Sequence, residues 1–305
     1  MRKTQNKIDM LCILGSTAVG KTHLAAALAK ILGSEIISAD SRQVYRDMDI
    51  GTGKDLDEYC INGEKIPYHL INIVDAGYEF NVFEYQQAFL KAYQEIKNRK
   101  ALPILCGGTG LYINAVLSGY KLVKVPEDNK LRDELRDKTD TELIVRLSGL
   151  RPLHNTTDTM NRNRLIRAIE IAEHSGKPEI DEFPCIETRT YGLRLERNDL
   201  KKRIAARLKT RLKNGMIEEV ERLLKKLTPE QLEFYGLEYR FVTKYVRGRL
   251  NRNDMFQKLN SAIYQFAKRQ EKWFRRMERN GIKIIWLEAK HPVGRLVKYI
   301  THGLK

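Results

Sequence analysis

The segment GSTAVGKT at residues 15–22 constrains this chain more than any other feature, because it matches the phosphate-loop pattern G-x-x-x-x-G-K-[ST] in full. An apolar run (10–15) precedes it and a helical pattern (21–32) follows it, which is the strand–loop–helix context that the pattern requires. Glycines let successive backbone N–H groups converge on an anion, and the helix N-terminus adds a favourable dipole. We therefore expect a phosphate-binding loop formed by Gly15, Ser16, Thr17, Ala18, Val19, Gly20, Lys21 and Thr22.

The side chains at the end of this loop indicate what it holds. Lys21 supplies a mobile positive charge, and the Thr22 hydroxyl is a candidate ligand for Mg²⁺. An ATPase or GTPase normally has a second strand that ends in a metal-binding Asp. Asp75 and Asp40 both follow apolar runs, but the run ILCGGTG (104–110) ends in glycines. This weakens the ATPase interpretation and leaves it open.

The first 120 residues alternate apolar runs with helical patterns, which predicts an α/β fold with a mostly parallel sheet, similar to that of P-loop NTPases. The helical patterns span residues 21–32 and 80–100. The expected strands are residues 10–15, 35–40, 68–74 and 102–107.

A different pattern begins near residue 121. Residues 121–186 are rich in charged side chains and have no good strands, so we expect a helical insertion projecting from a core made of residues 1–120 and 187–305. Within the insertion we expect helices at 130–138, 140–148 and 162–174. A strand is expected again at 189–196, then a largely helical C-terminal region with helices from 198 and across 254–279, and a last strand at 282–288.

Two side-chain stripes run along the helix that starts near Asn198. One is apolar and faces the core, and the adjacent one is basic, with both recurring every four residues. The basic stripe could reach a bound anion over the edge of the core, or it could be a solvated face. The apolar stripe is Leu200, Ile204, Leu208 and Leu212, and the basic stripe is Arg203, Arg207 and Arg211.

The formal net charge of +16 indicates an anionic partner, with nucleic acid the first candidate, although it could simply keep a basic protein in solution. The four cysteines are too scattered for a disulfide framework or a zinc site. No stretch approaches the roughly 20 apolar residues that span a bilayer, and no signal peptide opens the chain. We expect a cytoplasmic monomer with no membrane partner.

Asp40 ends the second predicted strand, so it should emerge beside the phosphate loop at the carboxyl edge of the sheet, where open α/β sheets bind ligands. Ser41 and Gln43 follow it and could hydrogen-bond the edge of a base. Asp40 or Ser41 could equally cap a following helix. Position alone does not separate the two interpretations.

Together with the phosphate loop, five further segments resemble the tRNA dimethylallyltransferases (tRNA isopentenyltransferases), in order from about residue 10 to 276. DSRQVY, GGTGLYI and AKRQ-x-x-W-F are the most specific parts. The segments are DSRQVYRDMDIGTGK (40–54), CGGTGLYINAVLSG (106–119), NRLIRAIEI (163–171), RIAARLKTRLKNGMIEEV (203–220) and AKRQEKWFRR (267–276).

This resemblance implies transfer of the dimethylallyl group of dimethylallyl diphosphate to N6 of the adenosine just 3′ of a tRNA anticodon, with Mg²⁺ as cofactor. The phosphate loop would then hold a diphosphate leaving group, and whether ATP also occupies it stays open. By the same resemblance Asp40 is the general base, Thr22 contacts diphosphate and metal, and Arg207 binds diphosphate. The insertion would hold the anticodon stem. The implied tRNA-binding residues are Asp40, Ser41, Arg42, Gln43, Thr109, Arg132, Asn163, Arg164, Leu165, Ile166 and Arg167.

The chain also departs from the family pattern in places. Ser16 and Val19 replace the usual loop residues, Asn161 stands where an Asp is expected, and YGLEYR (235–240) replaces an I-G-Y-K-E segment. These differences affect expected tRNA contacts more than the diphosphate site. We expect no C-terminal zinc-finger extension, and the chain resembles the short bacterial form.

Overall fold

The computed structural model describes residues 8–153, 161–174 and 183–304. The chain divides into two compact units, Met1–Gly119 with Cys185–Lys305, and Tyr120–Pro184. These boundaries lie within two residues of the limits expected for the core and the insertion. The larger unit is called the catalytic unit below, and the smaller one the insertion unit.

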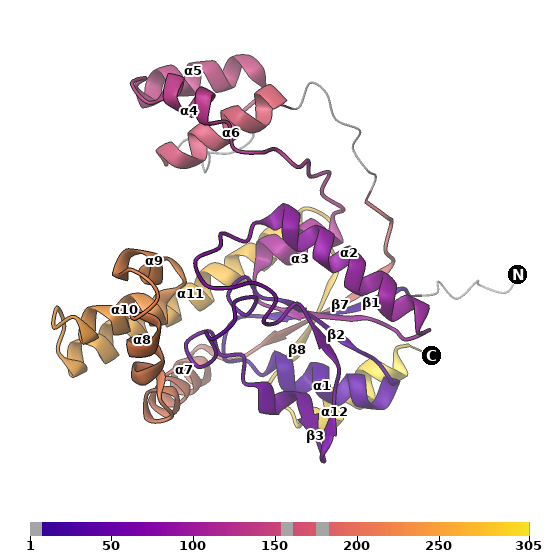
Figure 1. The fold of residues 1–305 in the computed structure, drawn as a ribbon. Helices are drawn as coiled ribbons and strands as arrows, with labels where there is room; N and C mark the ends of the chain where they lie inside the picture. The colour runs from indigo at the N-terminus through magenta and orange to yellow at the C-terminus, as the bar shows by residue number, and fades with distance from the viewer. Residues whose placement is uncertain (1–7, 154–160, 175–182, 305) are drawn as a thin grey trace, which may run out of the picture. The chain divides into compact units, whose positions relative to one another are not determined.

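A six-stranded parallel sheet forms the centre of the catalytic unit (Figure 1). Its strand order is β5-β2-β6-β1-β7-β8, and β1 pairs with both β6 and β7. Because β1, β2 and β6 are parallel neighbours, the loops that follow them meet at one edge of the sheet. The strands are β1 (Met10–Gly15), β2 (Ile36–Ala39), β5 (Tyr68–His69), β6 (Ile104–Gly107), β7 (Thr188–Arg194) and β8 (Ile284–Glu288).

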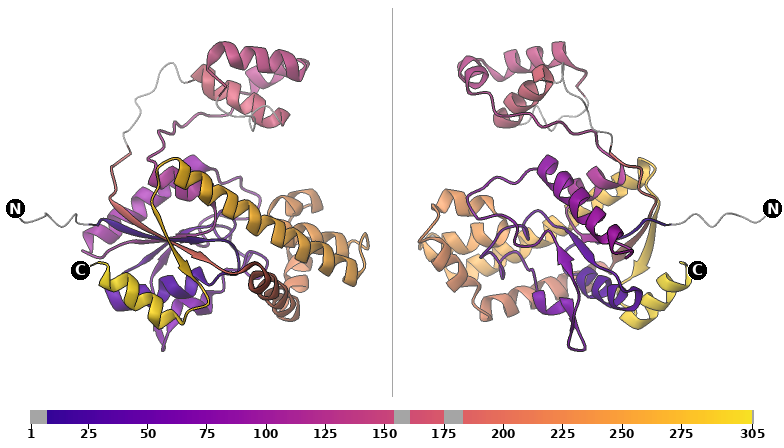
Figure 2. Two further views of the ribbon diagram at one scale, coloured as in Figure 1. Left: turned by 180° about the vertical axis from the view of Figure 1, so that it is seen from behind. Right: turned by 45° about the vertical axis from the view of Figure 1, so that its right-hand side comes forward.

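Helices cover both faces of the sheet (Figures 1 and 2). On one face α1 (Lys21–Leu32) packs with α12 (Val293–His302), and on the other α2 (Val82–Asn98) packs with α3 (Gly110–Leu117). Every residue of β1 is buried, as a strand covered on both faces must be. The α/β fold with a mostly parallel sheet is therefore confirmed.

The C-terminal helices form a layer beside the sheet edge that carries the phosphate loop. The long helix α11 contacts α3, α7 and α10, so it connects this layer to the core. Leu200, Ile204 and Leu208 of α7 are buried, as the apolar stripe predicted. The helices are α7 (Arg197–Lys213), α8 (Met216–Leu223), α9 (Pro229–Phe234), α10 (Leu237–Val246) and α11 (Arg252–Arg279).

The strand expected at 68–74 is wrong beyond His69. Leu70 and Asn72 have positive φ angles of 62° and 58°, which end the extended conformation that a sheet ladder requires. The backbone N–H groups of Asn72 and Ile73 instead donate to the segment after β2, at Gln43 and Val44. This irregular backbone fixes the segment that follows Asp40. Before it the chain forms a 3₁₀ turn (Leu56–Tyr59) and a short hairpin of β3 (Cys60–Ile61) and β4 (Glu64–Lys65).

The insertion unit has a small core of its own. It contains α4 (Asn129–Leu135), α5 (Asp140–Leu150) and α6 (Arg162–His174). Thr139 and Glu142 form a capping box that starts α5, which explains why the charged sequence forms a helix here. The core residues are Leu131, Leu135, Leu143, Leu147, Leu165, Ala168 and Ile169.

Within the described part of the chain, no helix is both long enough and apolar enough to cross a membrane.

Candidate functional site

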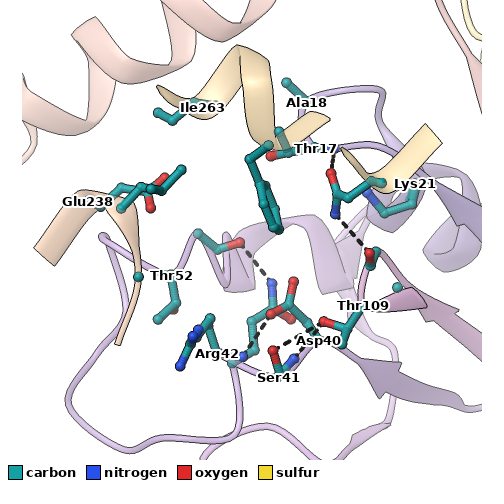
Figure 3. Close-up of a pocket in the computed structure, with 18 of the residues that line it drawn as sticks. Thr17, Ala18, Lys21, Asp40, Ser41, Arg42, Thr52, Thr109, Glu238 and Ile263 are labelled. Carbon is teal, nitrogen blue, oxygen red and sulfur yellow. Dashed lines mark hydrogen bonds between the residues drawn. The ribbon is translucent and has the colours of Figure 1, made fainter. Parts of the chain in front are cut away.

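A cavity of about 700 Å³ lies in the catalytic unit where the loops after β1, β2 and β6 meet (Figure 3). The phosphate loop, the segment after Asp40 and the GGTG segment of 107–110 line it on the sheet side. Residues of α7, α10 and α11, with Phe234 of α9 and the 3₁₀ turn at 56–59, line much of the remainder. Three segments far apart in the sequence, which share only their position after parallel strands, therefore meet in one site.

The phosphate loop has the shape that its glycines predict. Gly20 has a φ of 93°, and a side chain on Gly15 would place Cβ only 2.7 Å from the Leu193 carbonyl oxygen of β7. Lys21 Nζ donates to the Ser16 carbonyl oxygen at 2.8 Å, so the ammonium group lies over the loop. Burial, together with the nearby Arg207 charge, lowers the pKa of Lys21 to about 8.

Not every predicted loop residue reaches the cavity. Ser16 and Val19 are buried beneath the loop, and Gly15 packs against β7. These residues shape the backbone rather than present side chains to a ligand. The loop residues that line the cavity are Thr17, Ala18, Gly20, Lys21 and Thr22.

A glutamine on α11, whose role the sequence did not reveal, joins two of the loops. Gln270 Oε1 accepts from the Thr17 backbone N–H at 2.8 Å, and its Nε2 donates to the Gly108 carbonyl oxygen at 2.8 Å. A Cβ on Gly108 would lie 2.5 Å from Nε2. The glutamine of the AKRQ segment thus fixes the phosphate loop against the GGTG segment.

Trp273, one turn further along α11, packs against the same segment. A Cβ on Gly110 would lie 2.2 Å from its indole ring, so only glycine fits there. The indole ring is half-buried and lines the cavity. The specific spacing of GGTG and AKRQ-x-x-W is therefore a packing requirement between β6, α3 and α11.

Asp40 lies at the carboxyl end of β2 and lines the cavity opposite the phosphate loop (Figure 3). Its Oδ1 accepts from the Arg42 backbone N–H at 2.9 Å, which fixes a turn; no helix starts here, so the helix-cap interpretation is wrong. The Ser41 backbone N–H donates to Thr109 Oγ1 at 2.9 Å, and this bond ties the segment after β2 to that after β6.

The next two residues, which the family resemblance assigned to tRNA, also line the cavity. Gln43 is buried; its Nε2 donates to the Gly53 carbonyl oxygen at 3.0 Å and its Oε1 accepts from Ser38 Oγ at 3.2 Å. The guanidinium of Arg42 lies 5.4 Å from the centre of the exposed Phe234 ring, in cation–π geometry.

The basic stripe of α7 lies along the cavity, and its exposure to solvent falls from the exposed Arg203 to Arg211. Arg203, Arg207 and Arg211 all line it, and the Arg211 side chain is only 11% exposed. Arg203 Nη1 lies 3.4 Å from the Val19 carbonyl oxygen of the phosphate loop. The solvated-face alternative is therefore wrong for Arg211.

Arg207, the predicted diphosphate-binding residue, forms an ion pair with Asp55. Burial raises the pKa of the Asp55 carboxyl, but the Arg207 and Arg211 charges outweigh this and hold it below its usual value. Gly53 makes room for both arginines, because a Cβ there would lie 1.6 Å from Arg211 Nη2. The sequence did not single out Asp55 or Gly53, although both lie in or beside DIGTGK.

The remaining predicted tRNA-binding residues lie in the insertion unit. Arg132 and Arg167 both bind the buried Glu170 carboxylate, at 2.7 and 2.9 Å, so each is held by a structural contact and is only about one-third exposed. Leu165 lies in the core of this unit. Asn163 and Arg164 are exposed on the first turn of α6.

The unusual Asn161 keeps a capping role at the start of this helix. Its Oδ1 accepts from the backbone N–H groups of Asn163 and Arg164, at 3.0 and 3.3 Å. An amide oxygen caps a helix as well as a carboxylate does, so the change leaves α6 intact. Contact of any of these residues with tRNA stays a prediction.

Comparison with known proteins decides the family. The family model described as IPP transferase matches residues 43–277. This range includes most of the segment after Asp40, the GGTG segment and the AKRQ segment. This chain belongs to the IPP transferase family.

Relatives in the family match over nearly their full length. The tRNA dimethylallyltransferase 1 of Geotalea uraniireducens (strain Rf4) is 59% identical over 283 residues, covering 92% of this chain and 93% of the relative. The tRNA dimethylallyltransferase 2 of Bacteroides fragilis (strain YCH46) is 51% identical over 305 residues, covering 99% of each chain.

Solved structures of family members have the same fold. The full-length tRNA isopentenylpyrophosphate transferase of Bacillus halodurans superposes with a TM-score of 0.70 at 30% identity, covering 98% of this chain and 97% of that one. A eukaryotic dimethylallyltransferase acting on tRNA superposes with a TM-score of 0.77 at 25% identity, covering 97% of this chain and 80% of that one.

Proposed function

We propose that this member of the IPP transferase family transfers a dimethylallyl group from dimethylallyl diphosphate to N6 of the adenosine 3′-adjacent to a tRNA anticodon. One observation in this structure supports the proposal independently of the family match. A cation-lined phosphate loop and the Asp40 carboxylate face a single cavity, while the strand that would supply a metal-binding Asp in an ATPase, β6, ends in glycines. The site thus holds an anion opposite a proton acceptor.

The phosphate loop supports the departure of diphosphate. As the allylic carbon–oxygen bond breaks, its electron pair moves to the diphosphate oxygen, where negative charge grows. The loop amides and the Lys21 ammonium are donors fixed around that position, and the Arg207 guanidinium lines the same cavity, so these groups can bind the transition state more tightly than the donor itself. Enclosure in the cavity strengthens each of these interactions.

Asp40 supports the other half of the reaction. The N6 lone pair forms the new carbon–nitrogen bond, and the amine must then lose one proton. Asp40 is held by its turn with Arg42 and lines the cavity opposite the loop, where its carboxylate can accept that proton. The proton ends on Asp40, and neutral N6-dimethylallyladenosine and diphosphate are the products.

We assign Mg²⁺ to the diphosphate rather than to a preformed protein cage. Among the described residues no group of three or more acidic, histidine or cysteine side chains could hold a metal ion, whereas the Thr22 hydroxyl lines the cavity. Such a donor set fits an ion that keeps water and phosphate ligands. When bound, Mg²⁺ supplies positive charge that neutralises the leaving group.

The opening of the cavity suits an extruded base. Phe234, Phe266 and Trp273 bring aromatic side chains to its lining, and Phe234 and Phe266 are exposed at 51% and 39%. A stacked adenine must leave its neighbours before its N6 amine can react, and aromatic faces compensate for the lost stacking. We expect the basic charge of the chain to hold the RNA backbone around this opening.

Calorimetry with competing ligands tests the site assignment. We expect dimethylallyl diphosphate with Mg²⁺ to bind more tightly than ATP with Mg²⁺, and Lys21→Met to weaken the donor by at least about tenfold, as removal of a charged phosphate contact should. Lys209→Met, which removes a charge from the exposed face of α7, is the matched control. Tighter binding of ATP would favour a kinase instead.

A further inference from the structure

The Arg207 contact creates a difficulty for donor binding. In this structure Arg207 Nη2 binds Asp55 Oδ2 and also lies 3.4 Å from the Gly53 carbonyl oxygen. Arg207 lines the cavity, whereas Asp55 is not among its lining residues. Arg207 is therefore paired with a carboxylate that lies outside the lining of the cavity.

A second arginine lies beside the same carboxylate. Arg211 Nη2 lies 3.6 Å from Asp55 Oδ2, the same oxygen that Arg207 binds, and Arg211 Nη1 lies 3.7 Å from Glu238. Both distances are longer than a hydrogen bond to a carboxylate. Arg211 Nε is buried and has no hydrogen-bond partner among the described residues. Arg211 is thus a nearly buried cation with long ion-pair contacts and an Nε donor that is not used.

The local backbone is built around this arrangement. Asp55 has a φ of 43°, in the left-handed region that is uncommon for residues other than glycine. Gly53, two residues earlier, has a φ of 65° and leaves space in which the Arg211 guanidinium packs. The segment therefore brings one carboxylate within reach of two arginines at once.

The charges restrict what Arg207 can do. If Arg207 moved to a bound diphosphate and nothing else changed, Asp55 would keep only its 3.6 Å contact with Arg211 and lose its closest partner, which is unfavourable for a partly buried charge. If Arg207 stayed, its binding to the diphosphate would compete with Asp55. A cation that replaces Arg207 at Asp55 removes the conflict.

We propose that Arg211 is that replacement: it takes over Asp55 when Arg207 moves to the diphosphate, so Arg211 is a positioning residue for donor binding. The inference rests on the proposed diphosphate site and adds a counter-ion exchange to it. Arg207 would be released without an unpaired carboxylate. Glu238 keeps Arg211 in the cluster in both states.

Binding of inorganic diphosphate with Mg²⁺, measured by calorimetry on the full chain, tests the exchange. Arg211→Met should weaken binding about tenfold, because Arg207 then stays paired with Asp55. Asp55→Asn should bind at least as tightly as the unaltered chain, because it frees Arg207. The double variant Asp55→Asn/Arg211→Met should return to within about threefold of the unaltered chain, since the conflict no longer exists.

Rescue by the second substitution distinguishes the exchange from simpler roles. If Arg211 bound the diphosphate directly or only supported the fold, the double variant would bind as weakly as Arg211→Met or more weakly, and the exchange would be refuted. Unchanged binding by Arg211→Met would refute it too. Arg211→Lys keeps the positive charge but not the planar guanidinium, so it should lose less diphosphate affinity than Arg211→Met. It replaces Arg211→Met in the test if that variant is unstable. Lys209→Met controls for the lost charge.

The unaltered chain and Lys21→Met distinguish failure of this inference from failure of the proposed function. If the unaltered chain binds diphosphate and Lys21→Met does not, the diphosphate site stands, and the Asp55 and Arg211 variants judge the exchange alone. If Lys21→Met binds diphosphate as tightly as the unaltered chain, the site assignment itself is wrong.

Discussion

Glu219, a buried glutamate on α8, should control the stability of the segment that carries Gly53 and Asp55. Its Oε2 accepts from the backbone N–H groups of Asp49 and Ile50, at 2.9 and 2.8 Å. Its Oε1 accepts from the Gly51 N–H at 2.9 Å and from the Tyr239 hydroxyl at 2.8 Å. One carboxylate thus satisfies three consecutive backbone donors.

Glu219→Gln keeps the size of the side chain but replaces one of its two acceptor oxygens with an NH₂ group. In the better orientation the amide oxygen keeps Asp49 and Ile50, the Tyr239 hydroxyl reverses to accept, and the Gly51 N–H loses its partner. An unsatisfied buried donor costs about 1–3 kcal/mol, and loss of the charge weakens the two remaining bonds by roughly 1 kcal/mol each. We therefore expect the free energy of unfolding to fall by about 3–5 kcal/mol.

Urea denaturation measures this loss, and Glu218→Gln is the matched control, because the neighbouring Glu218 is exposed. Hydrogen exchange at the Gly51 amide should speed up in Glu219→Gln and stay unchanged in the control. Equal stability of the two variants, to within about 0.5 kcal/mol, would show that the loop does not depend on the carboxylate.

Three further predictions concern the cavity. Asp40→Asn should lower turnover at least about a hundredfold while tRNA affinity in a filter-binding assay stays within threefold, and parallel losses would assign Asp40 to structure alone. The pKa of Lys21 is about 8 in the free protein, and a bound anion raises it. Diphosphate binding should therefore take up protons near pH 8 and weaken as the pH rises above that value. Calorimetry in buffers of different ionisation enthalpy measures the proton uptake, which Lys21→Arg should abolish. Gly110→Ala should lower the stability by about 1–3 kcal/mol in urea denaturation, because Cβ would meet Trp273, whereas Gly294→Ala, which meets nothing within 4 Å, should not.

The sequence predicted the parts of the fold that depend on local patterns. The apolar run at 10–15 and the helix at 21–32 appear at the predicted residues, because burial on both faces and one amphipathic face are visible in the chain itself. The strand at 68–74 failed because two left-handed residues are set by hydrogen bonds to a distant segment. Tertiary contacts of this kind leave no periodic trace in the sequence.

The site was predictable to the same extent. The phosphate loop and Asp40 follow from motif and topology, and both line the cavity. The contacts of Gln270 and Arg211 were not predicted, because their partners lie 253 and about 156 residues away in the chain. What the sequence did contain was the glycine at 53 and the GGTG segment, whose missing side chains make room for these partners.

The central claim is that the phosphate loop releases diphosphate while the carbon chain passes to RNA. The most direct test incubates the protein with tRNA, Mg²⁺ and dimethylallyl diphosphate labelled with ¹⁴C in the dimethylallyl group and ³²P in the diphosphate. We predict that ¹⁴C enters the tRNA as N6-dimethylallyladenosine next to the anticodon and that an equal amount of ³²P is released as diphosphate. Appearance of ³²P in the RNA, or release of ³²P without ¹⁴C in the RNA, would contradict the account.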